Sequence, residues 1–82
     1  MPYIAIQAYP KDASIKQRVV ERINQVFLEE WGCAPEAISI SIEEVSPADW
    51  EETVMKAQVL KKTESMMILS GEKQYASGGD AQ

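Results

Sequence analysis

The sequence predicts a small α/β (α+β) protein built on a β-α-β unit, in which a helix joins two parallel strands. Two short segments rich in β-forming residues flank an amphipathic segment of about 18 residues. A helix of that length returns the chain from the end of one strand to the start of the next, which favours a parallel pair with a right-handed crossover. A second helical pattern follows and predicts a C-terminal helical segment.

The first strand is expected over Tyr3 to Tyr9, a short apolar stretch that ends at Pro10. Ile4 and Ile6 alternate with smaller or polar residues along this stretch. We therefore expect these two isoleucines to lie on the buried face of the strand.

The crossover helix is expected over residues 14–31. Ser14 and Gln17 have the spacing of a capping box, in which each side chain binds a free amide of the first turn. Gly32 lies where a left-handed residue would end the helix, and Pro35 prevents its continuation. The apolar residues recur at helical spacing: Ile15, Val19, Val20, Ile23, Val26 and Phe27. The cations of this segment are expected on its solvated face: Lys16, Arg18 and Arg22.

The second strand is expected over Ile38 to Val45, where isoleucines alternate with Ser39, Ser41 and Glu43. One face of this strand is therefore apolar and the other polar. Glu43 and Glu44 are adjacent and point to opposite faces, so they cannot act as a paired acid and base.

A second helix is expected to start with Ser46 at the N-cap and Pro47 in the first turn, and to extend to about residue 69. The pattern leaves open whether it is one helix or two pieces with a break near Lys56. The polar stretch from Ser70 to Gln82 is expected to be a frayed tail.

The chain has 82 residues, which is room for one domain, expected over residues 1–76, followed by a flexible tail over 77–82. A domain this short buries only about 60% of its unfolded surface. A single cysteine, Cys33, excludes an internal disulfide, and the absence of histidine excludes the usual zinc ligand sets. An isolated two-stranded sheet is also marginal. We therefore expect a homo-oligomer, in which a second copy extends the sheet to four strands.

The net charge of −5 argues against a nucleic-acid or anionic-membrane partner, because the eight cations are dispersed. No stretch approaches the roughly 20 apolar residues of a membrane span. No basic region precedes an apolar one near the amino terminus, as a secretory signal would require. These features predict a cytoplasmic protein.

Pro2 is the chemically unusual position, because removal of Met1 would make its nitrogen a free secondary amine. A terminal α-amino group has a pKa near 7.7–8.0, and an apolar surrounding lowers that pKa by disfavouring the charged form. Such an amine can act as a general base near neutral pH. The alternative is that Met-Pro is an ordinary start without catalytic consequence.

Cys33 follows a helix C-terminus, where the dipole disfavours a thiolate, and is expected to be structural.

The chain opens with Met1-Pro2-Tyr3-Ile4, continues with the long helix, and then has Ser39-Ile40-Ser41-Ile42 running on to Ser46-Pro47-Ala48-Asp49-Trp50. This order of motifs resembles the 4-oxalocrotonate tautomerase family. The most similar branch is that of the small dimeric phenylpyruvate-type tautomerases. Tyr9-Pro10-Lys11 resembles that branch's aromatic-Pro-Arg, with Lys11 in the place of the cation.

The resemblance implies a tautomerase-like domain without metal or organic cofactor, in which Pro2 moves the proton. It implies that Lys11 holds the substrate carboxylate and that Trp50 lines the pocket, although Trp50 is equally well read as a core residue. Ser39 lies at the position where many members of the tautomerase family have an arginine. Ser39 and Ser41 are candidates to bind a substrate oxygen, or else solvent-facing spacers, and Tyr3 is expected to serve packing.

A lysine cannot reproduce the two-pronged hydrogen bonding of arginine. The sequence therefore favours a keto-enol tautomerase that acts on a monocarboxylic 2-keto acid with an apolar or aromatic tail. The alternatives are a hydratase, decarboxylase or dehalogenase of the same superfamily, or a non-catalytic oligomeric binding module. The C-terminal segment, longer than a minimal family member needs, favours a dimer over a hexamer.

Overall fold

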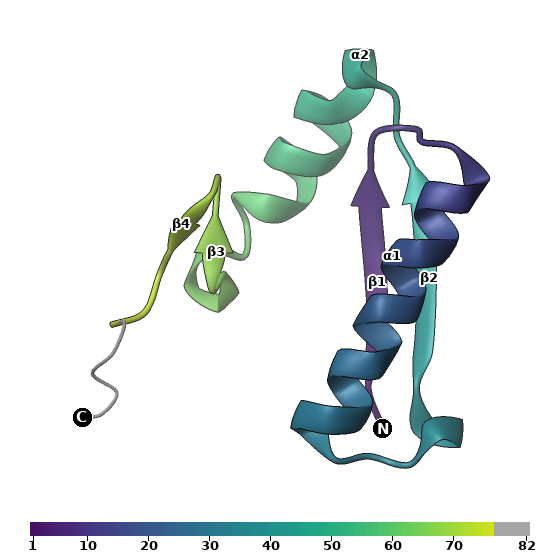
Figure 1. Ribbon diagram of the computed structural model, residues 1–82. Coiled ribbons are helices and arrows are strands. Elements are labelled where there is room, and N and C mark those ends of the chain that lie inside the picture. Colours follow the sequence, from purple (N-terminus) through teal and green to yellow (C-terminus); the bar gives the residue numbers. More distant parts are fainter. Residues whose placement is uncertain (77–82) are drawn as a thin grey trace. The chain divides into compact units, whose positions relative to one another are not determined.

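The computed structural model describes residues 1–76 and divides the chain into two compact units (Figure 1). The first unit comprises Met1–Pro47, and the second begins at Ala48. The single domain expected over residues 1–76 stays a prediction, and the tail expected over 77–82 lies outside the described residues. Among the helices of residues 1–76, none combines the length and apolar character that a membrane crossing needs.

The first unit is a parallel two-stranded sheet with one long helix between its strands (Figure 1). Strand β1 spans Tyr3–Ala8 and strand β2 spans Ser39–Glu44. Their register runs from Tyr3 opposite Ser39 to Ala8 opposite Glu44. The predicted α+β protein with a parallel strand pair and a connecting helix is therefore confirmed.

Helix α1 spans Ala13–Val26 and continues as a π-helical turn over Phe27–Trp31. Gly32 ends it with a φ of 71°, the left-handed conformation predicted for this glycine. A 3₁₀ turn, Pro35–Ala37, then leads into β2. The predicted helix over residues 14–31 is thus confirmed to within one residue at its start.

The predicted capping box at the start of α1 is wrong. The N-cap residue is Asp12, and no side chain caps the helix. The carbonyl oxygen of Asp12 accepts a hydrogen bond from the Lys16 N–H at 3.1 Å, so the helix has already begun at Ser14. Ser14 therefore lies inside the first turn, where the spacing to Gln17 has no capping function.

The sheet has one apolar face and one polar face, as the alternation in both strands predicts. Ile4 and Ile6 lie opposite Ile40 and Ile42 and are half-buried. Helix α1 covers this face, where a cavity of about 90 Å³ remains between the helix and the sheet. Isoleucine and valine side chains of both layers line that cavity: Ile6, Ile15, Val19 and Ile42. The opposite face presents Tyr3, Ser39 and Ser41, all exposed.

Helix α2, Pro47–Trp50, starts at the last residue of the first unit and continues in the second unit as a π-helix over Glu51–Val59. Lys56 lies within this helical segment, so there is no break at that residue. The helix begins at Pro47 as predicted, but the expectation that it extends to residue 69 is wrong. It is followed by a 3₁₀ turn, Thr63–Ser65, and by a short hairpin.

The hairpin consists of β3, Ile68–Leu69, and β4, Glu72–Lys73, which pair in antiparallel register. Ser70 and Gly71 connect them, with φ angles of 49° and 85°. Two central residues with positive φ are what a type I′ hairpin turn requires. The frayed tail expected from Ser70 onward is therefore wrong for the residues of this hairpin.

Neither unit has an extensive core. Within residues 1–76, Val54 at 4% exposure is the only buried side chain, and it belongs to the second unit. The isoleucines of the sheet are only half-buried. Large apolar side chains such as Tyr3, Trp31 and Met67 are more than half exposed.

Because Val54 is the one buried apolar side chain described, truncating it should destabilise the fold more than truncating its neighbours. We expect Val54→Ala to lower the free energy of unfolding by about 1–3 kcal/mol through lost burial and the cavity left behind. Leu60→Ala is the matched control, because Leu60 lies at the end of the same helix and is 53% exposed. Urea denaturation of both variants measures the difference, and equal losses would contradict this assignment.

Candidate functional site

Pro2 lies immediately before β1 and is half-buried. Its carbonyl oxygen accepts a hydrogen bond from the Ser39 N–H at 3.2 Å, which extends the parallel ladder by one step. Met1 is 98% exposed. The structure therefore holds Pro2 beside Ser39, at the amino ends of both strands.

Three hydroxyl groups share the uncovered face of the sheet near this end. Tyr3 lies opposite Ser39 in the register, and its hydroxyl lies 3.4 Å from the Ser41 Oγ. Tyr3 is 70% exposed, so within the first unit it does not pack as the sequence suggested. The signal that was missed is the alternation itself, because Ile4 on the apolar face puts Tyr3 on the polar one. These hydroxyls can donate hydrogen bonds to a substrate oxygen.

Lys11 lies at the other end of the sheet. Strand β1 has six residues, which at roughly 3.3 Å each put its two ends about 20 Å apart. Figure 1 shows the amino terminus at one end of β1 and the turn that precedes α1 at the other. Within one copy, the structure brings Pro2 and Ser39 together but does not bring Lys11 to them.

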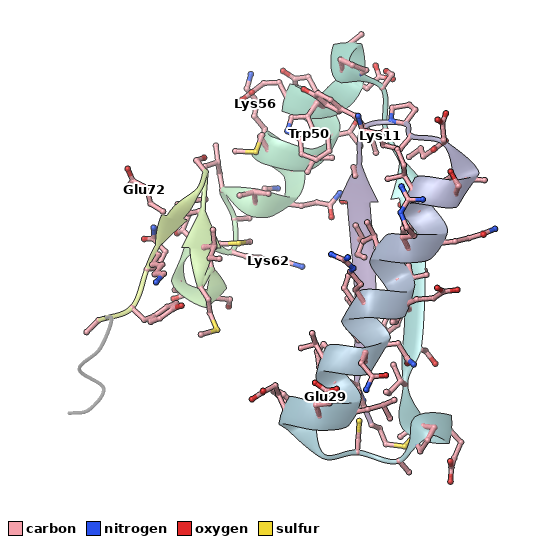
Figure 2. All side chains as sticks on the ribbon, in the orientation of Figure 1. Lys11, Glu29, Trp50, Lys56, Lys62 and Glu72 are labelled. Atoms are coloured by element: carbon pink, nitrogen blue, oxygen red, sulfur yellow. The ribbon has the colours of Figure 1, made fainter. Side chains whose placement is uncertain are left out.

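Trp50 belongs to the second unit, at the end of α2, and is half-buried (Figure 2). Its predicted role in lining a pocket stays a prediction. The alternative role, as a helix residue that packs within its own unit, is equally compatible with its partial burial.

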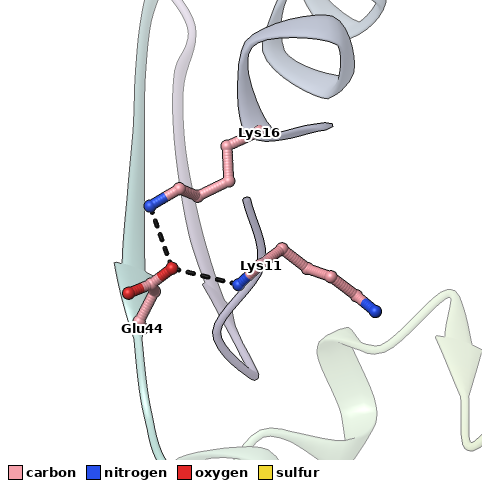
Figure 3. Close-up of polar contacts among 3 residues, drawn as sticks. All are labelled: Lys11, Lys16 and Glu44. Atoms are coloured by element: carbon pink, nitrogen blue, oxygen red, sulfur yellow. Dashed lines mark hydrogen bonds and ion pairs between the residues drawn. The ribbon is translucent and has the colours of Figure 1, made fainter. Parts of the chain in front are cut away.

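Glu44 organises the turn that contains Lys11. One carboxylate oxygen, Oε2, accepts hydrogen bonds from the Lys16 ammonium at 2.9 Å and from the Lys11 backbone N–H at 3.1 Å (Figure 3). Lys16 and Glu44 are about one-third exposed. Lys16 is therefore paired with a carboxylate, in contrast to the solvated position expected from the sequence.

Glu43 and Glu44 point to opposite faces of β2, as predicted. Glu43 accepts a hydrogen bond from the Gln7 side chain at 3.0 Å, across the polar face of the sheet. Glu44 points to the side of α1, where Lys16 is located. Sequence reasoning could not identify the role of Glu44, because its two partners are 28 and 33 residues away along the chain.

The pKa of Glu44 is held below its ordinary value of 4.5, chiefly by the hydrogen bond from the Lys16 ammonium and secondly by that from the Lys11 backbone N–H. A lowered pKa in the folded state means that the carboxylate stabilises the protein above the unfolded pKa. That contribution is lost as the pH falls through the lowered pKa. We expect wild type to be more stable than Glu44→Gln at neutral pH, with the two curves converging as the pH falls through the lowered pKa and Glu44 becomes protonated.

Urea unfolding of both proteins from pH 7 to pH 3 measures this convergence. The matched control is Glu43→Gln, which removes a carboxylate that has no lysine partner in the described structure. A difference between wild type and Glu44→Gln that stays constant over this pH range would contradict the assignment.

No family model and no curated protein matches the sequence. The resemblance to the tautomerase family therefore depends on the sequence motifs alone and stays a prediction.

Proposed function

We propose that this protein is a cofactor-independent keto-enol tautomerase of the 4-oxalocrotonate tautomerase type. Its substrate is a 2-keto acid with an apolar or aromatic tail. The observation that carries the proposal is the position of Pro2, which is half-buried and hydrogen-bonded to Ser39 beside an uncovered face rich in hydroxyl groups. An amine at this position would belong to a residue that is only partly exposed.

Removal of Met1 would give Pro2 the free secondary amine that the reaction needs. In the enol-to-keto direction, the amine takes the proton of the C2 hydroxyl and returns a proton to C3. The electrons of the broken O–H bond form the C2 carbonyl, those of the C2–C3 double bond form the new C3–H bond, and no atom is gained or lost. A terminal amine suits this step because α-amino groups in general have pKa values near 7.7–8.0.

The hydroxyls of Ser39, Tyr3 and Ser41 are suited to bind the C2 oxygen as negative charge develops on it. Hydrogen-bond donors directed at developing charge stabilise a transition state without reorganising during the reaction. Ser39 is tied directly to Pro2, because its own N–H donates a hydrogen bond to the Pro2 carbonyl oxygen. This arrangement supports the predicted role of Ser39 in substrate binding.

In this proposal, the residue that binds the substrate carboxylate is Lys11 of a second copy. The two ends of β1 lie about 20 Å apart, which is too far for Pro2 and Lys11 of one copy to share a small acid. If two sheets join edge to edge about a twofold axis with antiparallel strands, the amino end of one β1 lies beside the carboxyl end of the other. A homodimer of this kind would create two identical sites and would also bury apolar surface that one copy leaves exposed.

Subunit complementation tests the shared site. We expect Lys11→Met and a chain with a blocked Pro2 nitrogen to be impaired separately in the conversion of enolic phenylpyruvate to its keto form. Mixing the two chains under conditions of subunit exchange should restore about a quarter of wild-type activity, because half of the dimers formed carry one intact site.

Lys61→Met is the matched control, since it removes a lysine of the second unit and should leave the activity unchanged. Mixed chains that form heterodimers and stay as inactive as the separate variants would refute the shared site. Analysis of the product by mass distinguishes the alternative reactions, because hydration, decarboxylation and dehalogenation change the molecular formula and tautomerisation does not.

A further inference from the structure

Two lysines lie close to one carboxylate at the carboxyl end of the sheet. Glu44 binds Lys16 through the ammonium group but binds Lys11 only through its backbone N–H. The Lys11 side chain extends away from Glu44 (Figure 3). Within residues 1–76, the structure gives the Lys11 ammonium no hydrogen bond or ion pair.

We propose that Glu44 is a positioning residue that prepares Lys11 to bind the carboxylate of the substrate. This inference rests on the proposed function and deepens it. Glu44 neutralises Lys16 and anchors the backbone of Lys11, so that the Lys11 ammonium remains as the cation available to an anion at this end of the sheet.

Anchoring the backbone matters because Lys11 follows β1 in a short turn before α1 begins at Ala13. A lysine side chain already loses rotamer freedom when it binds a ligand, and a mobile backbone would add to that cost. A hydrogen bond from a backbone N–H to a carboxylate is charge-assisted and among the stronger ones. It joins the turn to the last residue of β2, which belongs to the sheet.

The pairing of Glu44 with Lys16 matters for a second reason. A carboxylate substrate would be repelled by an unpaired Glu44, so a free glutamate beside Lys11 would oppose the binding of an acid. Because Lys16 lies 2.9 Å from Glu44 Oε2, the two charges cancel locally and Lys11 contributes the net positive charge. Lys16 therefore allows Glu44 to anchor the Lys11 backbone without repelling the substrate.

The experiment separates the anchor from the charge. We expect Glu44→Ala to raise KM for phenylpyruvate, and Kd for the unreactive acid 3-phenylpropionate, by about three- to tenfold, with kcat within about twofold of wild type. Glu44→Gln should largely restore binding, because its amide oxygen still accepts the Lys11 N–H. Hydrogen exchange of the Lys11 amide should accelerate in Glu44→Ala and much less in Glu44→Gln.

Lys16→Met in the Glu44→Ala background tests the alternative in which Glu44 serves only to cancel the Lys16 charge. In that case the double variant, which lacks both charges, would bind like wild type, and the anchoring role would be overturned. Persistent weak binding in the double variant supports the anchor. Lys16→Met alone keeps the bond to the Lys11 N–H but leaves Glu44 unpaired, and should bind the acid more weakly than Glu44→Gln does.

The outcomes also separate this inference from the proposed function. If Glu44→Ala keeps wild-type KM and Kd while turnover still depends on Pro2 and Lys11, the positioning role is refuted and the tautomerase proposal stands. If wild type binds 3-phenylpropionate through Lys11 but turns over no keto acid, the tautomerase proposal fails. A weaker Kd in Glu44→Ala would then still support Glu44 as the residue that prepares an anion site.

Discussion

Blocking the nitrogen of Pro2 should lower kcat/KM for the enol-to-keto conversion of phenylpyruvate by about 10²- to 10⁴-fold, the usual contribution of a general base. The block can be acetylation of the processed chain or retention of Met1. Both convert the secondary amine into an amide, which has no lone pair available for a proton. Because Pro2 is held against Ser39 through its carbonyl oxygen, neither modification should disturb the strand pairing.

The measurement combines ultraviolet detection of the enol with intact mass of the same sample, so that activity is compared with the fraction of chains that begin at Pro2. The matched control is a chain with one added residue at its carboxyl terminus, which should keep full activity. In the processed enzyme, activity should also fall as the pH decreases through the pKa of the amine, because the protonated form cannot accept a proton. Full activity in a sample whose mass shows only Met1-containing chains would exclude Pro2 as the base.

The stability of the protein should depend strongly on its concentration. The first unit contains no fully buried side chain among its described residues, and its sheet has two strands. A fold of this kind needs burial from outside the single chain. For folding coupled to dimer formation, each tenfold dilution should lower the apparent free energy of unfolding by about 1.4 kcal/mol of dimer.

Thermal unfolding from micromolar to millimolar chain concentration measures this dependence, and light scattering gives the molecular mass. A midpoint that rises with concentration, together with the mass of two chains, is the expected result. A larger assembly would preserve the concentration dependence and exclude the dimer. A midpoint independent of concentration in a particle with the mass of one chain would refute association, and with it the shared site of Pro2 and Lys11.

Local patterns predicted the first unit well because its elements depend on residues that are near one another in sequence. Alternating isoleucines identified both strands, and Gly32 identified the end of α1 through its need for positive φ. The error at the start of α1 arose because the spacing of Ser14 and Gln17 matches a capping box, whereas the N-cap residue is Asp12.

The second unit was harder to predict because apolar residues after Val59 continue the helical spacing of the preceding segment. Met66 and Met67 extended the apparent helix, but the helical segment ends at Val59 and the chain turns into a hairpin. The Ser70-Gly71 pair was the available signal, since serine followed by glycine between apolar residues is typical of a tight turn. Because the residues after Ser70 are mostly polar, the segment was predicted to be a frayed tail and the turn was missed.

The sequence by itself determined the β-α-β order, the apolar and polar faces of the sheet, and the choice of Pro2 as the candidate base. These follow from periodicity and from the chemistry of single residues. Only the tertiary structure showed that Ser39 is hydrogen-bonded to Pro2, that Lys11 lies at the far end of the strand, and that Glu44 joins Lys16 to the Lys11 backbone. The physical reason is that these relations depend on the register between strands about 36 residues apart, and no local pattern specifies that register.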